Sequence, residues 1–343
     1  MTKIGLDLGY ANITLSDETA DIYREPSVAL VHRNSRPDQR RIISVGNDAL
    51  LTSTDADALP VRPFKNGILF DSQLTAEIIS HAISAVKTKD KIRCVVGVPS
   101  DFLPKQEKEL LTMLNEAGVD TAVAVARPVA AIIGAGYSPS MSVISVNIGA
   151  QATEVAVMYK GEILYLERHA IGGEDFDRVV KQFILEQGDV NISLGVARTI
   201  KERLGAVWKG KPSESIDIEG TLSLTGNQLR MNLTTEDIVG VFEKPMQELI
   251  KAIVSGVKRI PPEAVEAVFD NGIILTGGGA ELFGIETLLA RVLGITVTKP
   301  AAAIDCVAKG LSRINGFLPT KGKYAGKNIT AQVAKFYEDS KKK

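Results

Sequence analysis

Two glycine-rich turns, far apart in the chain, each lie between two apolar, β-branched segments. The first turn covers residues 7–12 and the second covers residues 147–153. A strand, a tight turn and a returning strand form a β-hairpin, whose exposed backbone N–H groups can face a phosphate chain. Two such hairpins predict a nucleotide that is clamped between two related halves of the molecule.

A third glycine-rich segment is the most specific single motif. The sequence Thr276-Gly277-Gly278-Gly279-Ala280 follows an apolar strand at 273–275 and precedes an expected helix at 281–293. Consecutive glycines let the backbone approach a flat or anionic ligand, with the N–H groups of the helix pointing at it. Such a turn also fits a purely structural role, and the two hairpins are what favour ligand binding.

The order of the expected elements predicts an α/β fold built from two related domains that face each other. Each half contains a hairpin, a third strand and then alternating strands and helices. Strands are expected at 3–8, 13–16, 27–32, 41–45, 92–98, 123–126, 142–147, 154–159, 162–170, 215–223 and 228–233. Helices are expected at 74–87, 105–117, 129–135, 172–186, 196–204, 234–259 and 328–337, the last docking on its own domain or on a partner.

Composition excludes several classes of protein. The 343 residues suffice for two domains, and a formal net charge of −1 does not favour a nucleic-acid partner. Two cysteines are too few for a disulfide framework, which favours a cytoplasmic location. Direct membrane insertion is not expected, because the chain enters a strand at once, the loop at 87–91 is charged, and no apolar segment approaches the roughly 20 residues of a membrane span.

Asp7 is the candidate metal ligand. It ends the first strand, next to the first turn, and is predicted to contact Mg²⁺ directly or through water. The alternative is an Asx-type cap of that turn. Taken alone, Lys201 and Glu202 fit ordinary solvated charges on a helix.

The two hairpins and the Thr-Gly-Gly-Gly segment resemble the nucleotide signatures of the actin, heat-shock ATPase and sugar-kinase superfamily. Shorter motifs resemble the bacterial actin family MreB, whose branch includes MamK. These motifs are Glu-Pro-Ser-Val-Ala at 25–29, Val-Gly-Asn-Asp-Ala at 45–49, Arg-Pro-Phe-Lys-Asn-Gly at 62–67, Gly-Val-Pro at 97–99, Ala-Ala-Ile-Ile-Gly-Ala-Gly at 130–136 and Gly-Gly-Glu-Asp-Phe-Asp at 172–177.

This resemblance implies an actin-like fold with four subdomains, which binds ATP or ADP with Mg²⁺ in a central cleft and polymerises. Domain I would comprise residues 1–141 and 311–343, with a small subdomain at about 30–63. Domain II would comprise residues 142–310, with a small subdomain at about 178–245. The implied nucleotide contacts are Asp7, Gly9, Tyr10, Ala11 and Asn12 in the first phosphate loop, Gly149, Ala150 and Thr153 in the second, and Lys201, Glu202, Gly277, Gly278 and Gly279 around the adenosine.

The sequence departs from the family pattern at the two positions that carry the chemistry. Arg127 replaces the usual Glu thought to position the attacking water, and Asn147 replaces the usual metal-facing Asp. An arginine binds phosphate but cannot act as a base near neutral pH. We therefore expect bound nucleotide, weakened Mg²⁺ dependence and hydrolysis slowed by ~10²-fold or more. The alternative is that Arg127 pairs with Asp7 or another acid and leaves the cleft empty.

The expected function is a cytoplasmic, cytoskeletal filament whose principal partner is another copy of the chain. Its role would be organelle positioning of the magnetosome type or cell shape, with adaptor or organelle-surface proteins as further partners. One alternative is a non-polymerising adaptor that keeps a structural nucleotide. A metabolic kinase is less favoured, because the chain lacks the inserted sugar-binding regions usual in such enzymes.

Overall fold

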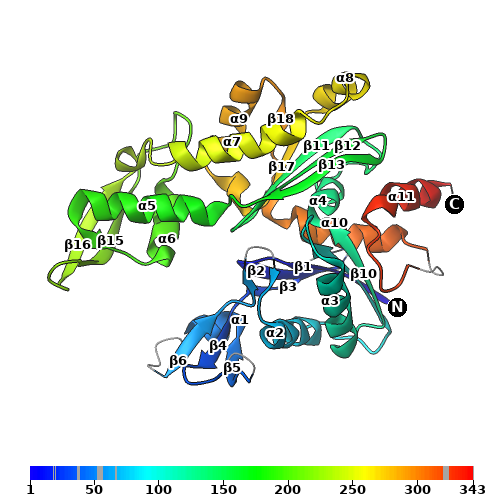
Figure 1. Cartoon of the computed structure of the whole chain (residues 1–343), viewed down its shortest axis with the longest axis horizontal. Helices are drawn as coiled ribbons and strands as arrows, with labels where there is room; N and C mark the ends of the chain where they lie inside the picture. Colours follow the sequence, from blue (N-terminus) through cyan, green and yellow to red (C-terminus); the bar gives the residue numbers. More distant parts are fainter. Residues whose placement is uncertain are drawn as a thin grey trace.

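The computed structural model describes residues 1–17, 19, 21–36, 39–51, 57–65, 68–319 and 324–342. Asn66 and Gly67 of the Arg-Pro-Phe-Lys-Asn-Gly motif lie outside these residues, as do parts of the expected small subdomain at 30–63. Two α/β halves lie one above the other in Figure 1, each built on its own five-stranded sheet. The prediction of two facing α/β halves is therefore confirmed.

The first sheet has the order β10-β9-β1-β2-β3. Strands β1 (Thr2–Leu8), β9 (Ile92–Val98) and β10 (Thr121–Ala126) are parallel, and β2 (Asn12–Ser16) returns antiparallel to β1 as predicted. Strand β3 (Asp21–Pro26) then pairs with β2. Every residue of β9 is buried, as a strand covered on both faces should be. Helices α2 (Ser72–Ser84) and α3 (Pro104–Glu116) accompany this sheet.

The second sheet has the order β13-β12-β11-β17-β18. Strands β11 (Val143–Ile148), β12 (Thr153–Tyr159) and β13 (Glu162–His169) form an antiparallel meander. Strand β17 (Ile273–Thr276) is parallel to β11, and the short β18 (Val297–Thr298) follows it. Helices α7 (Glu243–Val257) and α8 (Pro262–Asn271) pack on the side away from α4 (Figure 1).

Two helices between the halves are packed unusually closely. Helix α4 (Arg127–Gly134) follows β10, and α10 (Cys306–Phe317) returns from the second half to pack on α4, β1 and β9. A Cβ atom on Gly310 would lie 1.8 Å from the carbonyl oxygen of Ala130, and one on Gly134 would lie 1.7 Å from that of Cys306. The two backbones can approach this closely only because glycine stands at both positions.

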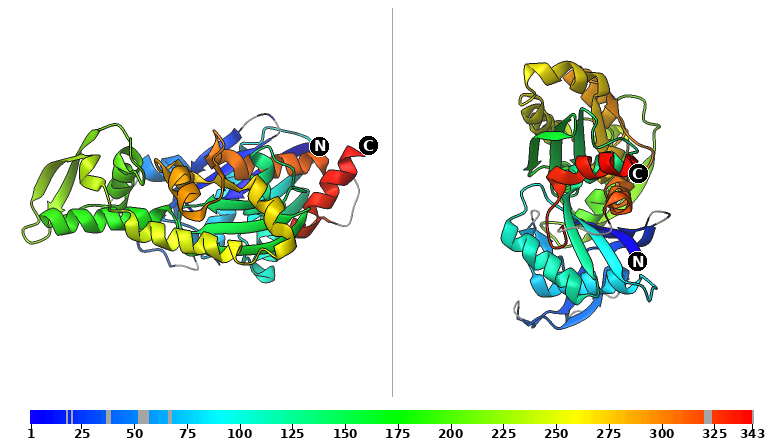
Figure 2. Two further views of the ribbon diagram at one scale, coloured as in Figure 1. Left: turned by 90° about the horizontal axis from the view of Figure 1, so that it is seen from above. Right: turned by 90° about the vertical axis from the view of Figure 1, so that its right-hand side faces the viewer.

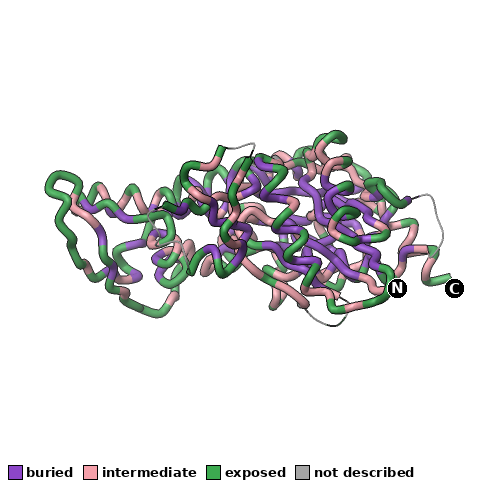
Figure 3. The backbone as a smooth tube through the Cα atoms, turned by 90° about the horizontal axis from the view of Figure 1, so that it is seen from below, coloured by how far each residue is buried: buried purple, intermediate pink, exposed green. Residues whose placement is uncertain are grey.

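Two small three-stranded sheets extend from the same end of the molecule (Figure 1). One contains β4 (Ala29–His32), β5 (Ile42–Val45) and β6 (Ala58–Val61), together with helix α1 (Gly46–Leu51). The other contains β14 (Val190–Asn191), β15 (Ser215–Leu222) and β16 (Gln228–Thr234), beside α5 (Gly173–Gly188) and α6 (Leu194–Leu204). Buried residues are concentrated in the two large sheets, and the small β14–β16 sheet is mostly exposed (Figure 3).

The described chain ends in α11 (Val333–Lys341), preceded by a 3-10 turn at Thr330–Gln332. Its Tyr337 ring meets Phe317 of α10 edge-on, and Ser140 Oγ donates to Glu338 at 2.7 Å. The terminal helix thus docks on its own chain, which was one of the two expectations. Both termini lie at the end of the molecule opposite the β14–β16 sheet (Figure 2).

Besides the terminal helix, which begins at Val333 and not at residue 328, two predicted helices begin later than expected. Residues 236–238 form only a 3-10 turn, and α7 starts at Glu243 because Gly240, with φ +85°, reverses the chain between them. The glycine-rich segment likewise continues as a 3-10 turn at Gly278–Glu281, and α9 (Ile285–Leu293) follows Gly284, whose φ is +79°. Helix α9 therefore does not begin at the Thr-Gly-Gly-Gly turn. Strands β3, β6, β14 and β18, the two-residue strands β7 (Phe64–Lys65) and β8 (Ile68–Leu69), and helices α1, α8 and α10 were not predicted.

Candidate functional site

A cavity of about 490 Å³ opens where the carboxyl ends of the parallel strands of both sheets meet. Ligands of open α/β sheets bind at this edge, because the loops that follow the strands converge there. Both hairpin turns and the glycine-rich segment line the cavity. Of the predicted site residues, those that line it are Asp7, Gly9, Tyr10, Ala11, Asn12, Arg127, Asn147, Gly149, Ala150, Lys201, Glu202, Gly277, Gly278 and Gly279.

Thr153 is the predicted contact that does not line the cavity. Its side chain is fully buried, and its Oγ1 donates to the carbonyl oxygen of Ile171 at 2.7 Å. The hydroxyl therefore ties the second hairpin to the segment that leads into α5. Its position behind the turn makes the residue a support for the loop, in place of the direct contact that was expected.

The carbonyl groups of the first turn are held by the protein. Arg62 Nη1 donates to the carbonyl oxygens of Tyr10 at 2.9 Å and Ala11 at 3.1 Å, and Ser27 Oγ donates to that of Gly9 at 2.6 Å. With the carbonyls fixed in this way, the amide N–H groups are the polar backbone groups of the turn that remain for an anionic ligand.

The second turn is closed on itself and tied to α5. The Gly149 amide donates to the carbonyl oxygen of Ala152 at 2.8 Å, so this N–H group is used inside the turn. The amides of Gly173 and Glu174 donate to the carbonyl oxygens of Gly149 at 2.9 Å and Ala150 at 2.7 Å. The turn and the first residues of α5 consequently behave as one rigid unit at the cavity wall.

Arg127, the first residue of α4, is bound to two carboxylates. Its Nε lies 3.1 Å from Asp7 Oδ1, its Nη1 lies 3.5 Å from Glu154 Oε2, and its Nη2 donates to the Leu8 carbonyl oxygen at 2.7 Å. The two carboxylates outweigh desolvation and raise the pKa of Arg127, so the guanidinium stays charged. Burial raises the pKa of Asp7, although Arg127 acts in the opposite sense. The pairing with Asp7 that was weighed as an alternative is therefore present.

A row of three polar residues on the second sheet faces the cavity, and sequence reasoning found only one of them. Asn147 on β11 pairs in register with Glu154 on β12, which pairs with Arg168 on β13. Glu154 is 3% exposed, and its Oε1 accepts from Ser100 N and Oγ at 2.7 Å each. The alternation of the second hairpin was the signal that could have placed Glu154 beside Asn147. The charge that Arg127 adds is thus offset locally.

Arg168 lies mostly buried at the far end of this row. Its Nη1 is 3.6 Å from Asp101, whereas its Nη2 has no hydrogen-bond partner among the residues that the structure describes. Arg127 and Arg168 thus place two guanidinium groups in the inner wall of the cavity, beside the carboxylates of Asp7 and Glu154. The Nη2 group of Arg168 is available to an anionic ligand.

Asn147 is 7% exposed, and its amide oxygen accepts from Thr276 Oγ1 at 3.3 Å. No group of three His, Cys, Asp or Glu side chains suited to a metal ion occurs in the described ranges. Asp7, the predicted Mg²⁺ ligand, is already paired with Arg127, and Asn147, which also lines the cavity, carries no charge. This donor set does not fit a magnesium ion held by the protein, which prefers carboxylates that are free to coordinate.

The three glycines of residues 277–279 differ in what they face. A Cβ atom on Gly277 would lie 2.4 Å from the Ile148 carbonyl oxygen, and one on Gly279 would lie 2.2 Å from Ile148 Cγ2. Both positions need glycine so that the segment can pack against the second hairpin. Only at Gly278 is the added Cβ position open, with its nearest neighbour, Ile304 Cδ1, at 3.9 Å. The close approach to a ligand that was predicted for all three is available at Gly278.

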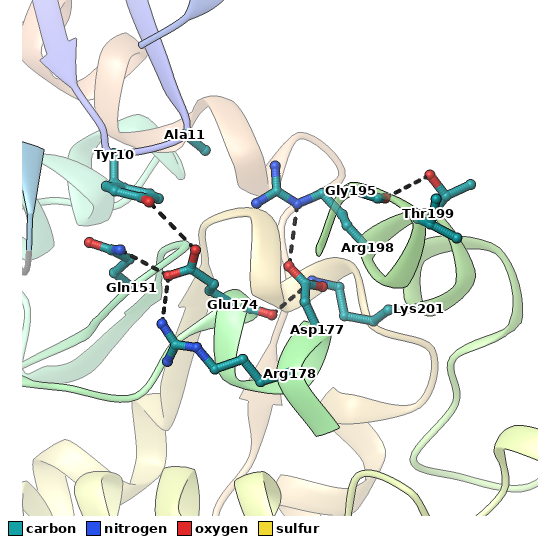
Figure 4. Close-up of polar contacts among 12 residues, drawn as sticks. Tyr10, Ala11, Gln151, Glu174, Asp177, Arg178, Gly195, Arg198, Thr199 and Lys201 are labelled. Carbon is teal, nitrogen blue, oxygen red and sulfur yellow. Dashed lines mark hydrogen bonds and ion pairs between the residues drawn. The ribbon is translucent and has the colours of Figure 1, made fainter. Parts of the chain in front are cut away.

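The two predicted residues of α6 also differ in whether their side chains are already bound to the protein. Lys201 Nζ lies 2.6 Å from the buried carboxylate of Asp177 and donates to the Gly173 carbonyl oxygen at 3.0 Å, so the amine holds the start of α5 (Figure 4). Glu202 is exposed on the cavity wall. Glu202 is thus the side chain of this pair with room to meet a ligand.

Residues 1–320 match the family model described as MreB/Mbl protein. Mbl of Bacillus cereus, described as a cell shape-determining protein, is 29% identical over 316 residues, 90% of this chain and 93% of that one. MreB of Escherichia coli K12 is 28% identical over 316 residues, 90% of this chain and 91% of that one.

Two solved structures share the fold. MreB 5 of Spiroplasma citri bound to AMPPNP superposes with a TM-score of 0.82 at 22% identity, over 90% of this chain and 94% of that one. A MamK double helical filament gives a TM-score of 0.78 at 23% identity, over 92% and 99%. The predicted actin-like fold is confirmed, and none of the described helices is long and apolar enough to cross a membrane. The chain belongs to the MreB/Mbl family of bacterial actin-like cytoskeletal proteins.

Proposed function

We propose that this protein binds ATP or ADP in the cavity between its halves and assembles into filaments that hydrolyse the nucleotide slowly. The two phosphate turns, the open backbone at Gly278 and the Arg168 guanidinium support binding of a phosphorylated ligand. The related MreB 5 structures are bound to AMPPNP and to ADP, and the related MamK structure is a filament.

The observation that carries slow hydrolysis is the position of Arg127 between Asp7 and Glu154. An attacking water needs an acceptor that takes its proton, and a guanidinium cannot provide one near neutral pH. Asp7 and Glu154 are the acids beside Arg127, but Arg127 binds Asp7 and one oxygen of Glu154, and Ser100 binds the other oxygen of Glu154. The donor set around Asp7 likewise supports a weakened dependence on Mg²⁺. ATP would therefore stay bound longer than it does where an acid occupies the Arg127 position.

The division of the chain follows from this proposal. Domain I would comprise residues 1–141 and 311–343, with the β4–β6 sheet as its small subdomain. Domain II would comprise residues 142–310, with the β14–β16 sheet as its small subdomain. The adenosine would lie against Gly278 and Glu202, and the phosphates between the two turns.

The cellular role that we propose is a cytoplasmic filament for cell shape, as named for the Mbl and MreB relatives, or for positioning an organelle, with adaptor or organelle-surface proteins as partners. The second candidate is a non-polymerising adaptor. The Arg127–Asp7 ion pair favours this second candidate, because it already neutralises charge beside the phosphate turns. A bound nucleotide would then serve as a fixed structural part.

Sedimentation of the full chain with ATP, with ADP and without nucleotide tests the proposal, with released phosphate measured in the same samples. We expect pelleted filaments with ATP and with ADP, and phosphate release ~10²-fold slower than in MreB-type relatives that retain the acid. Phosphate release at the rate of those relatives would contradict slow hydrolysis. Nucleotide binding without any pelleting would favour the adaptor.

A further inference from the structure

One side chain of the first phosphate turn reaches across the cavity. Tyr10 follows β1 in the first half, and Glu174 stands at the start of α5 in the second half. The Tyr10 hydroxyl donates to Glu174 Oε1 at 3.5 Å (Figure 4). Both residues line the cavity beside the two phosphate turns. The contact therefore joins the two walls between which a nucleotide would enter and leave.

The Tyr10 ring is braced from its own half. The guanidinium of Arg62 lies 5.1 Å from the ring centroid, and its Nη1 also donates to the carbonyl oxygens of Tyr10, Ala11 and Ser27 at 2.9, 3.1 and 3.2 Å. A cation over an aromatic face and three bonds to backbone restrict both the ring and the turn that carries it. Burial and the Glu174 carboxylate raise the pKa of Tyr10, so the hydroxyl keeps its proton and acts as the donor.

The Glu174 carboxylate is equally well fixed in the other half. Its Oε2 accepts from Gln151 Nε2 at 2.9 Å and from Arg178 Nη2 at 3.1 Å, and the residue is 8% exposed. It also occupies the first turn of α5, where the helix dipole stabilises a negative charge. Since Gln151 belongs to the second phosphate turn, the carboxylate links that turn to Tyr10 of the first.

We propose that Tyr10 and Glu174 form a clasp across the cavity that sets how fast a bound nucleotide leaves. This inference rests on the proposed function, because it assumes a nucleotide whose phosphates lie between the two turns. Release then requires the two walls to separate, which breaks the contact. A hydroxyl-to-oxygen hydrogen bond is usually about 2.7–2.8 Å long, so the 3.5 Å contact tightens if the halves move slightly together. Arg62 acts as a positioning residue, through the ring.

The test is the release rate of ATP labelled with a fluorescent N-methylanthraniloyl group on the ribose, chased with excess unlabelled ATP. Tyr10→Phe keeps the ring beneath Arg62 and removes only the hydroxyl. We expect release about three- to tenfold faster, the range for a hydrogen bond of ordinary net strength, because the 3.5 Å contact to the carboxylate is long. Tyr159→Phe is the matched control. It also removes one hydroxyl, which donates to Glu263 at 3.3 Å outside the cavity, and should not change the rate.

A double-mutant cycle separates the clasp from a general loosening of the turn. Glu174→Ala should also speed release, and Tyr10→Phe should add nothing further in that background. Equal release rates in the wild type and Tyr10→Phe, or full additivity of the two changes, would overturn the clasp. Failure of the wild type to bind the labelled ATP at all would overturn the proposed function instead.

Discussion

Arg127 and Asp7 form a 3.1 Å ion pair inside the cavity, at the carboxyl ends of two parallel strands of the first sheet. The same guanidinium reaches Glu154 of the second sheet, so one arginine contacts both walls. In the hydrolysis that we propose, this is the position at which an acid would be needed to activate water. The geometry makes the Arg127 position the central question about the chemistry of this protein.

Restoring both family residues should restore turnover. Arg127→Glu combined with Asn147→Asp replaces the guanidinium by an acid and adds a second carboxylate beside Asp7. We expect phosphate release at least about tenfold faster than in the wild type, and a strong requirement for Mg²⁺, since the clustered carboxylates then need a cation. Phosphate release with and without EDTA measures both effects.

The matched control for this double change is Arg230→Glu with Asn232→Asp, which alters charge equally on β16. Arg230 pairs with Glu219 on the exposed hairpin, outside the cavity. Its phosphate release should equal that of the wild type. An unchanged rate in the Arg127 and Asn147 double variant would show that slow hydrolysis has another cause.

Alanine at two neighbouring glycines should separate folding from binding. Gly279→Ala forces its Cβ against Ile148 and should lower the free energy of unfolding by about 1–3 kcal/mol. Gly278→Ala has open space, so the chain should keep its stability while the added methyl group weakens nucleotide binding. Denaturant unfolding and titration with labelled ATP measure the two effects. A Gly278→Ala variant with wild-type affinity would place the ligand away from this segment.

The buried Arg93 should make Asn315 critical for stability. Arg93 is 2% exposed, and it donates to Asn315 Oδ1 and to the Asn315 carbonyl oxygen at 2.6 Å each. Asn315→Ala removes the first of these acceptors and should cost about 3 kcal/mol in unfolding free energy. Asn271→Ala removes an exposed amide that donates to the Ala267 carbonyl oxygen, and should cost much less. Equal losses in denaturant unfolding would contradict this role of Asn315.

His169 should make stability depend on pH below neutrality. Burial lowers its pKa from the ordinary 6.5, and its Nε2 lies 3.1 Å from the Tyr165 hydroxyl and 3.3 Å from Ser255 Oγ. As pH falls through 6.5, the unfolded chain takes up this proton more readily than the folded chain, so stability is lost. Between pH 7 and pH 5, the melting temperature should fall less in His169→Gln than in the wild type. An equal decrease in melting temperature for the wild type and His169→Gln would contradict the prediction.

Local sequence determined much of the architecture. The β-branched segments and glycine turns predicted both hairpins, and the apolar segment at 92–98 predicted the buried β9, because side-chain periodicity and turn chemistry act over a few residues. Strand β3 was not predicted, because its Asp-Ile-Tyr-Arg-Glu-Pro sequence has little apolar periodicity. Pairing with β2 is what holds this segment extended. Helix α10 was not predicted either. The close packing of α4 against it is the reason that residue 310 is a glycine.

For the candidate site, the sequence by itself determined which segments line the cavity, and it drew attention to Arg127 and Asn147. Only the tertiary structure decided what these residues contact. The ion pairs of Arg127 with Asp7 and Glu154 join positions 120 and 27 residues apart, and the Tyr10–Glu174 contact joins positions 164 apart. Such partners are set by the packing of the two sheets, and the free energy of a charge depends on the partners and burial that this packing gives it.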